Sequence, residues 1–256
     1  NKWGYNNSRV NELSDAQQVE MDPQKRRDLV LQIQETIYND AASSPIVYPS
    51  MTNAYREDKL KGVVPQVGEG IGSLWTDIAA TTSTSDGYIR TGQTSPLKNL
   101  NPVSVTDSNE FKELRMIYDR LLQVGPDGSI EPWAATAIKA VDSTTVDITL
   151  REGMTFHDGQ PVTPADVKFT FDYHKQWKAP FFISSLEKFE SVTITGKNTL
   201  RVKLTAPHAP LMINFFAQIF ILPQHIWKDI PEKVNVDDVL KFANENPIGS
   251  GPFKFD

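Results

Sequence analysis

The sequence predicts an α/β fold with mixed sheets in more than one layer, and two periodic patterns support this. Apolar and polar residues alternate over 146–150 and within 192–204, as they do in strands with one buried face. Apolar residues also recur three and four apart over 30–41, 111–121 and 167–177, as in helices that pack on a sheet. Because helices and hairpins do not alternate strictly along the chain, a single parallel sheet is disfavoured.

The first forty residues are predicted to form two helices. Ser8 can cap a short one, and Asp22 followed by Pro23 gives the second a capping carboxylate and a favourable first helical position. Pro45 ends this second helix, and 46–48 is a short β-type run. The apolar stripe of the second helix consists of Val30, Ile33, Ile37 and Ala41.

The next part of the chain is poor in apolar anchors. Gly, Pro and small polar residues dominate between Gly62 and Gly72, and residues 79–86 include the polar run TTSTSD. Such composition is typical of loops, so we expect a linker over 79–86. Residues 88–93 follow as a predicted strand.

The chain after residue 100 carries clearer signals for regular structure. Ser108 or Asn109 can cap the helix that follows, and Thr163 before Pro164 can start another. The two alternating runs within 192–204 flank 196–198 (Gly-Lys-Asn), which predicts a hairpin that turns there.

Charge and composition exclude several classes of protein. The 256 residues carry a net charge of −6 at pH 7, so we expect no binding to nucleic acid or to an anionic membrane surface. The absence of cysteine excludes disulfides, thiol catalysis and Cys-ligated zinc. The longest apolar stretch, 211–222, is too short to cross a bilayer. The first residues do not resemble an export signal, which is expected to be removed or absent.

Motifs for catalysis and metal binding are incomplete. The glycines of 68–72 miss the spacing of a dinucleotide-binding loop. Ser250 has glycines as immediate neighbours rather than two residues away, so it is interpreted as a turn residue and not as a nucleophile. His225 and Asp229 could share a helix face but lack a third metal ligand. We therefore predict no catalytic residue, no metal site and no cofactor.

Some aromatic residues lie outside apolar patterns. Trp3, Tyr5 and Trp75 have polar or Gly-rich neighbours, whereas Phe111 and Phe171 fit the core faces of helices. Exposed aromatic side chains near loops commonly form the walls of a cleft for a small molecule or a peptide.

Longer stretches resemble one known family. The run from Leu150 to Asp172, LREGMTFHDGQPVTPADVKFTFD, is similar to the signature of the family 5 extracellular solute-binding proteins, the peptide, dipeptide and nickel receptors of ABC importers. Further similar stretches are LNP at 100–102, IYDRLL at 117–122, EPW at 131–133, LPQHIW at 222–227 and NPIGSGPF at 246–253. The first eighty residues resemble the C-terminal end of the same family through WGYN at 3–6, DPQKRR at 22–27, IVYP at 46–49 and NAYR at 53–56.

The resemblance implies an incomplete periplasmic-binding-protein-like α/β fold, of class II and the large peptide-receptor type, in permuted order and without the family's middle portion. A circular permutant in two chains, a junction of two tandem receptors and a chain that lost its middle portion all fit this order. The implied division is a helical remnant of the second lobe over 1–45, the C-terminal segment of lobe one over 46–78, the linker over 79–86, lobe one over 87–99 and 206–256, and a family-specific α/β subdomain over 100–205.

The same resemblance implies a function. The protein would be the extracytoplasmic solute-binding component of an ABC importer, in the periplasm or lipid-anchored at the cell surface, and not an enzyme. Its partners would be a peptide or another small solute, the permease, and a complementary chain that supplies the missing middle portion. An oligosaccharide-binding member of the family stays open, as does a hydrolase of small esters or peptides that uses Ser250 or His225.

Candidate binding residues also come from the resemblance. In relatives the loop after 100–102 faces the cleft, so Thr106, Asp107 and Ser108 are the polar candidates, although Ser108 can instead act only as a helix cap. Trp3 and Tyr5 are expected to form a wall of the cleft.

This arrangement leads to three structural expectations. Residues 46–62 should lie beside a sheet that contains 87–93 and 248–255. Residues 100–205 should form a compact subdomain whose sheet is covered by the helix over 163–177. The apolar stripe of the second helix should stay exposed unless another chain covers it.

Overall fold

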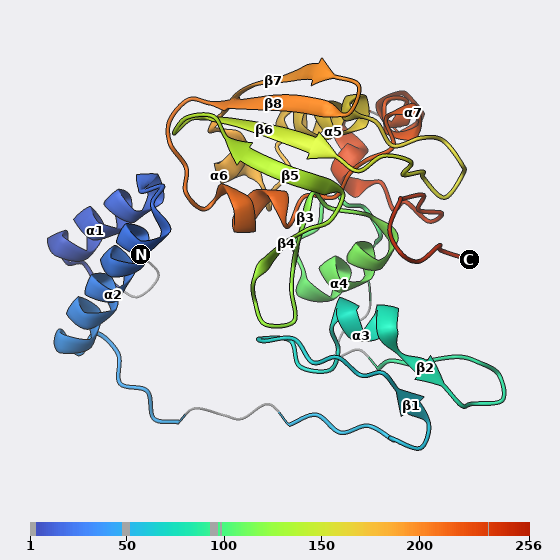
Figure 1. Cartoon of the computed structure of the whole chain (residues 1–256), viewed down its shortest axis with the longest axis horizontal. Helices are drawn as coiled ribbons and strands as arrows, with labels where there is room; N and C mark the ends of the chain where they lie inside the picture. The colour runs from blue at the N-terminus through green and yellow to red at the C-terminus, as the bar shows by residue number, and fades with distance from the viewer. Residues whose placement is uncertain (1–3, 48–51, 93–96, 98, 235) are drawn as a thin grey trace.

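The computed structural model describes residues 4–47, 52–92, 97, 99–234 and 236–256, with the side chains of 236–238 excepted. Its main body contains a four-stranded antiparallel sheet in the order β5-β6-β8-β7 (Figure 1). The strands are β5 (Ala135–Ala140), β6 (Thr145–Leu150), β7 (Phe189–Gly196) and β8 (Thr199–Leu204). The predicted hairpin is confirmed, because β7 and β8 pair antiparallel on either side of 197–198. The predicted alternation is confirmed in β6 and β8, where the buried Val146 and Ile148 lie opposite Val202 and Leu200.

Helix α5 (Pro164–Gln176) packs against β7 and β8, as the periodicity predicts. It begins with a capping box in which the Thr163 N–H and hydroxyl donate to Asp166 Oδ2 at 2.9 and 2.7 Å. Val167 and Phe171 of this helix are buried against the sheet. The helix over 163–177 therefore covers the sheet, as expected.

The core of this body continues beyond residue 205. Phe215 and Phe216 of the π-helical turn η1 (Met212–Phe216) are fully buried, and the ring of Phe171 packs on both. Short helices complete this layer: α6 (Ile183–Leu186), α7 (Gln224–Trp227), α8 (Ile230–Lys233) and the 3₁₀ helix η2 (Val236–Lys241). The core thus joins residues 100–205 to the segment after them, and the domain boundary at 205 stays a prediction.

Helix α4 (Ser108–Ile117) lies below the sheet in Figure 1, next to the hairpin of β3 (Leu122–Val124) and β4 (Ile130–Pro132). Residues 249–253 run along its C-terminal end, where the N–H of Gly251 donates to the carbonyl of Ile117 at 2.8 Å. The approach is so close that a Cβ on Gly249 would lie 2.0 Å from that carbonyl oxygen. A glycine is required here because the two backbones touch.

Residues 58–92 differ from two expectations. The predicted linker 79–86 contains the end of α3 (Leu74–Ala79) and all of β2 (Thr81–Thr82), which pairs with β1 (Leu60–Lys61). The predicted strand 88–93 is absent from its described part, 88–92, and residues 248–255 form no strand either. Within the predicted segment 46–62, Leu60 and Lys61 pair with Thr82 and Thr81, and the described residues 87–92 and 248–255 form no sheet beside them.

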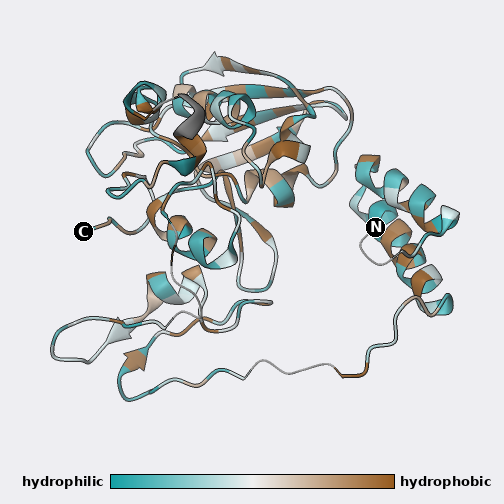
Figure 2. Ribbon diagram, turned by 180° about the vertical axis from the view of Figure 1, so that it is seen from behind, coloured by the Kyte–Doolittle hydropathy of each residue, from teal (hydrophilic) through white to brown (hydrophobic). Residues whose placement is uncertain are grey.

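Helices α1 (Ser8–Val19) and α2 (Pro23–Asn39) form a hairpin to one side of the main body (Figure 1). Asn7, and not Ser8, caps α1, while Asp22 caps α2 as predicted. Both helices carry apolar and polar residues (Figure 2). The predicted stripe is half-buried at Val30, Ile33 and Ile37, because α1 covers part of it.

The hairpin contacts the main body near residue 209. The N–H of Ala209 donates to the carbonyl of Gln18 at 2.8 Å. Residues 42–47 and 52–57, which follow the hairpin, are exposed. Among the described residues, none of the helices combines the length and apolar character needed to span a membrane.

Candidate ligand-binding site

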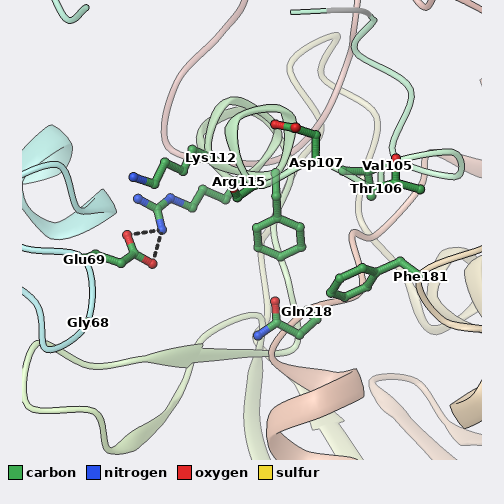
Figure 3. Close-up of a pocket in the computed structure, with 11 residues that line it drawn as sticks. Gly68, Glu69, Val105, Thr106, Asp107, Lys112, Arg115, Phe181 and Gln218 are labelled. Carbon is green, nitrogen blue, oxygen red and sulfur yellow. Dashed lines mark hydrogen bonds and ion pairs between the residues drawn. The ribbon is translucent and has the colours of Figure 1, made fainter. Parts of the chain in front are cut away.

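A cavity of about 440 Å³ opens beside α4 (Figure 3), a volume within the range of small-molecule and peptide pockets. Three parts of the chain form it: the loop at 68–69, the stretch from Val105 through α4, and two single residues from the main body. Its lining consists of Gly68, Glu69, Val105, Thr106, Asp107, Ser108, Phe111, Lys112, Arg115, Phe181 and Gln218.

The structure brings the three predicted polar residues together at this cavity. Thr106 and Ser108 are exposed at its rim, and Asp107 lies between them. Asp107, rather than Ser108 or Asn109, is the cap of α4, because its Oδ1 accepts the N–H of Asn109 at 2.8 Å. The hydroxyls of Thr106 and Ser108 are thus not required for capping, and their contact with a ligand stays a prediction.

Tyr5, one of the two predicted aromatic wall residues, does not line this cavity. Tyr5 lies at the start of the α1–α2 hairpin, where its hydroxyl donates to Asp40 Oδ2 at 2.7 Å. Asn7 donates to the same oxygen at 2.6 Å, so Tyr5 helps to tie the two ends of the hairpin together. Trp3 lies outside the described residues.

One side of the cavity is an ion pair that the sequence analysis did not identify. Arg115 Nη1 donates to both carboxylate oxygens of Glu69, at 2.8 and 2.6 Å, and its Nη2 donates to the carbonyl of Gly72 at 3.2 Å. The Arg115 side chain is 4% exposed and that of Glu69 is 27% exposed. Burial raises the pKa of the nearby Asp77 carboxyl, and the positive charge of Arg115 partly opposes this increase.

The other side of the cavity is aromatic. The ring centroid of Phe111 lies 5.9 Å from that of Phe181 and 4.9 Å from that of the buried Phe220. Phe181 is 49% exposed, although its ring is directed towards the cavity (Figure 3). Sequence reasoning assigned Phe111 to the core and did not consider Phe181, because the Pro180-Phe181-Phe182 run carries no periodic pattern.

The residues considered for catalysis have other roles in the structure. Both ring nitrogens of His157 face backbone groups that flank Ser250: Nε2 lies 3.0 Å from the Gly251 carbonyl, and Nδ1 lies 3.4 Å from the Gly249 N–H. His225 Nε2 instead pairs with Asp158 Oδ2 at 2.7 Å. A serine nucleophile needs a base within hydrogen-bond reach, and neither histidine bonds to Ser250. The part of the chain that is described contains no cluster of three potential metal ligands.

Comparison with known proteins identifies one family. Residues 129–256 match the bacterial extracellular solute-binding proteins, family 5 Middle. The oligopeptide-binding protein AppA of Bacillus subtilis is 30% identical over 158 residues, which are 60% of this chain and 28% of AppA. An ABC transporter peptide-binding protein of Brucella abortus is 36% identical over 103 residues, 39% of this chain and 19% of that protein.

Solved structures give the same result. AppA in complex with a nonapeptide superposes with a TM-score of 0.56 at 27% identity, over 64% of this chain and 32% of AppA. The mannohexaose-bound oligopeptide-binding protein of Thermotoga maritima gives 0.53 at 29% identity, over 62% of this chain and 29% of that one. The chain spans about a fifth to a third of the length of these relatives.

These matches confirm the predicted family and its periplasmic-binding-protein-like α/β fold, of which this chain represents a part. The permuted order and the missing middle portion stay predictions. The relatives are named as binding proteins, which agrees with a cavity lined by apolar, aromatic and fixed polar groups. The family match covers half of the chain, and the chain therefore belongs to the bacterial extracellular solute-binding proteins of family 5.

Proposed function

We propose that this chain is part of the extracytoplasmic receptor of an ABC importer, which binds a peptide and delivers it to the permease. The cavity beside Thr106, Asp107 and Ser108 is the place where the peptide contacts this chain. The observation that carries the proposal is that the loop indicated by the family resemblance lines a cavity of about 440 Å³. The match to relatives named for peptide binding supports it.

The proposal includes binding without catalysis. Ser250 and His225, the residues of the hydrolase alternative, have no hydrogen bond to each other in the described structure. The receptor would act outside the cytoplasmic membrane, free in the periplasm or lipid-anchored at the cell surface, where family members meet their permease. Incubation with generic ester and peptide substrates tests this part, and turnover would contradict it.

An oligosaccharide is the second candidate ligand. The mannohexaose-bound relative from Thermotoga maritima supports this alternative, because it is 29% identical over its matched part. Aromatic rings such as Phe181 can stack on a sugar as well as on a side chain. Peptide stays the leading ligand because the AppA structure holds a nonapeptide and most of the named relatives are peptide-binding proteins.

A complementary chain is a separate part of the proposal. The stripe of Val30, Ile33 and Ile37 is only half-buried by α1, so apolar surface is left for another polypeptide to cover. A chain that carries the family's middle portion would provide that cover and the second wall of the cleft. Co-expression of such a chain, followed by size-exclusion chromatography, should give one joint peak, and two separate peaks would contradict this part.

The binding function can be tested by filling the cavity. Thr106→Trp places a large side chain at its rim, whereas Ser85→Trp places the same side chain at an exposed position outside it. Ligand-observed saturation-transfer NMR detects binding even at millimolar affinity. We expect a tripeptide mixture to give signals with the wild type and Ser85→Trp, and weaker signals with Thr106→Trp. Equal signals for all three proteins would show that peptides do not use this cavity.

A further inference from the structure

Phe181 lies in an unusual position for a large apolar residue. Its neighbour Phe182 is 1% exposed and belongs to the core, whereas Phe181 is 49% exposed. The ring centroids of Phe181 and Phe182 lie 5.1 Å apart and the ring planes meet at 78°, so the buried Phe182 packs against the ring of Phe181. Because Phe181 also lines the cavity, any ligand that covers its ring removes apolar surface from water.

Phe111 lies next to Phe181 on the aromatic side of the cavity. Its ring is inclined at 36° to that of Phe181, and Phe220 and Arg120 support it from within the protein. Arg120 is held in place by a hydrogen bond from Nη1 to the carbonyl of Ala217 at 2.9 Å. At a centroid distance of 5.9 Å the two rings touch, so together they form one apolar surface, here called the wedge, whose Phe111 side is fixed by the core. A planar apolar group can pack on this surface.

The charged groups of the cavity are largely satisfied within the protein. Arg115 pairs with Glu69, and Asp107 accepts the N–H of Asn109. Lys112 has no ion pair within 4 Å in the described part of the chain, but it lies on the Arg115 side and away from Phe181 (Figure 3). A charged ligand group packed on these two rings would lose its water without gaining a partner, which is unfavourable.

Gln218 provides a polar group in the same cavity as the two aromatic rings. It lines the cavity, and in Figure 3 its side-chain amide points away from the ring of Phe181. This amide makes no hydrogen bond within the described residues. An amide provides both donors and an acceptor, which matches the N–H and C=O of a peptide group. The Ala217 carbonyl, bonded to Arg120, fixes the backbone just before it.

We propose that this cavity selects peptides with an uncharged aromatic side chain, which packs on the accessible side of the Phe111–Phe181 pair while Gln218 bonds to the adjacent peptide group. The proposal rests on the peptide-binding function proposed above. It adds a chemical class of ligand and assigns the selectivity to Phe181, whose position in a loop allows replacement with little effect on the core.

The test compares three tripeptides, Ala-Phe-Ala, Ala-Ala-Ala and Ala-Glu-Ala, with the full chain by saturation-transfer NMR titration. We expect Ala-Phe-Ala to bind about tenfold more tightly than the other two, as burial of an aromatic ring predicts, with the strongest signals on its ring protons. Phe181→Ala should abolish this preference, so that the three peptides bind the variant with equal affinity. Gln218→Leu should weaken all three peptides. Phe253→Ala removes a comparably exposed ring outside this cavity and should change nothing.

The possible failures are distinguishable. If the three peptides bind equally to the wild type, the aromatic selectivity is wrong and the peptide-binding function stands. If the preference survives Phe181→Ala, the aromatic group binds elsewhere and the assignment of the wedge is wrong. If no peptide binds while mannohexaose does, both the selectivity and the peptide function are overturned in favour of the oligosaccharide alternative.

Discussion

Arg115 and Glu69 form an ion pair whose contribution to stability depends on how much water reaches it. Arg115 is 4% exposed, so Glu69→Gln leaves a buried guanidinium facing a neutral amide. We expect a loss of about 2 kcal/mol in the free energy of unfolding, less than the roughly 3–5 kcal/mol of a fully buried pair because Glu69 is partly exposed. Urea unfolding of the wild type and the variant measures this loss of stability.

The matched control for this change is Glu190→Gln. Glu190 pairs with Lys203 at 3.0 Å, and the two side chains are 46% and 52% exposed. Water screens such a pair, so we expect the free energy of unfolding to change by less than about 0.5 kcal/mol. Equal effects of the two substitutions would show that burial does not govern the Arg115 pair.

His174 provides a residue-scale prediction about pH. It is fully buried in α5, where Nδ1 donates to the Thr170 carbonyl at 2.8 Å, and burial lowers its pKa from 6.5 to about 4. Between these two values the unfolded chain binds a proton and the folded one does not. The contribution of the neutral His174 to stability is therefore fully present above pH 6.5. The free energy of unfolding falls by roughly 3 kcal/mol as the pH drops to about 4.

The His174→Gln variant isolates this contribution from that of the carboxylates. The free energy of unfolding should decline less steeply in the variant than in the wild type between pH 6.5 and about 4, measured by urea titration at several pH values. Parallel declines in the two proteins would mean that His174 does not carry the effect.

At the scale of elements, the length of an element decided whether its pattern could be recognised. Strands β6 and β8 are six residues long and bury alternate side chains, so their period of two is visible in the sequence. Strands β1 and β2 have two residues each, which is too short for any period. The predicted strand at 88–93 failed because Tyr88 and Ile89 are 67% and 42% exposed, so their apolar character does not reflect burial.

The hairpin of α1 and α2 allows a test at this scale. Asp22 Oδ1 accepts the N–H groups of Gln24 and Lys25 at 2.9 and 3.0 Å. Asp22→Ala should cost about 1 kcal/mol of local helix stability, since two N–H groups lose their acceptor. Hydrogen exchange of the α2 amides should accelerate about fivefold, while the amides of α5 stay unchanged.

Asp28→Ala, within the same helix, serves as the control. Asp28 accepts a side-chain hydrogen bond from Gln24 and no helix N–H group. Exchange in α2 should therefore stay close to that of the wild type. Acceleration of α5 by Asp22→Ala would show that the hairpin and the main body unfold together.

At the scale of the whole molecule, the candidate site combines segments that are far apart in sequence. The motif resemblance led to Thr106, Asp107 and Ser108, because they follow a recognisable loop. Glu69 and Phe181 lack any motif and reach the cavity only through the packing of the loop at 66–70 and of the loop after α5. Their roles depend on tertiary contacts, which no local pattern encodes.

The isolated chain is expected to bind peptides weakly, with a dissociation constant of about 1 mM or above. One open wall offers hydrogen bonds worth only about 0.5–1.5 kcal/mol each, against the larger cost of lost translational and rotational freedom. Isothermal titration calorimetry with the tripeptides measures this. Micromolar affinity for the chain alone would refute the need for a second wall.

The assembly of the cavity from distant segments also links ligand binding to folding. A solute that needs Glu69, Thr106, Phe181 and Gln218 in place binds only the native chain, because the unfolded chain does not hold these groups together. Such a solute shifts the folding equilibrium by mass action, by about 2.7 kcal/mol at a concentration one hundred times its dissociation constant. Thermal denaturation thus becomes an assay for the solute itself: each compound of a library can be ranked by the rise in melting temperature that it causes, whatever its chemical class.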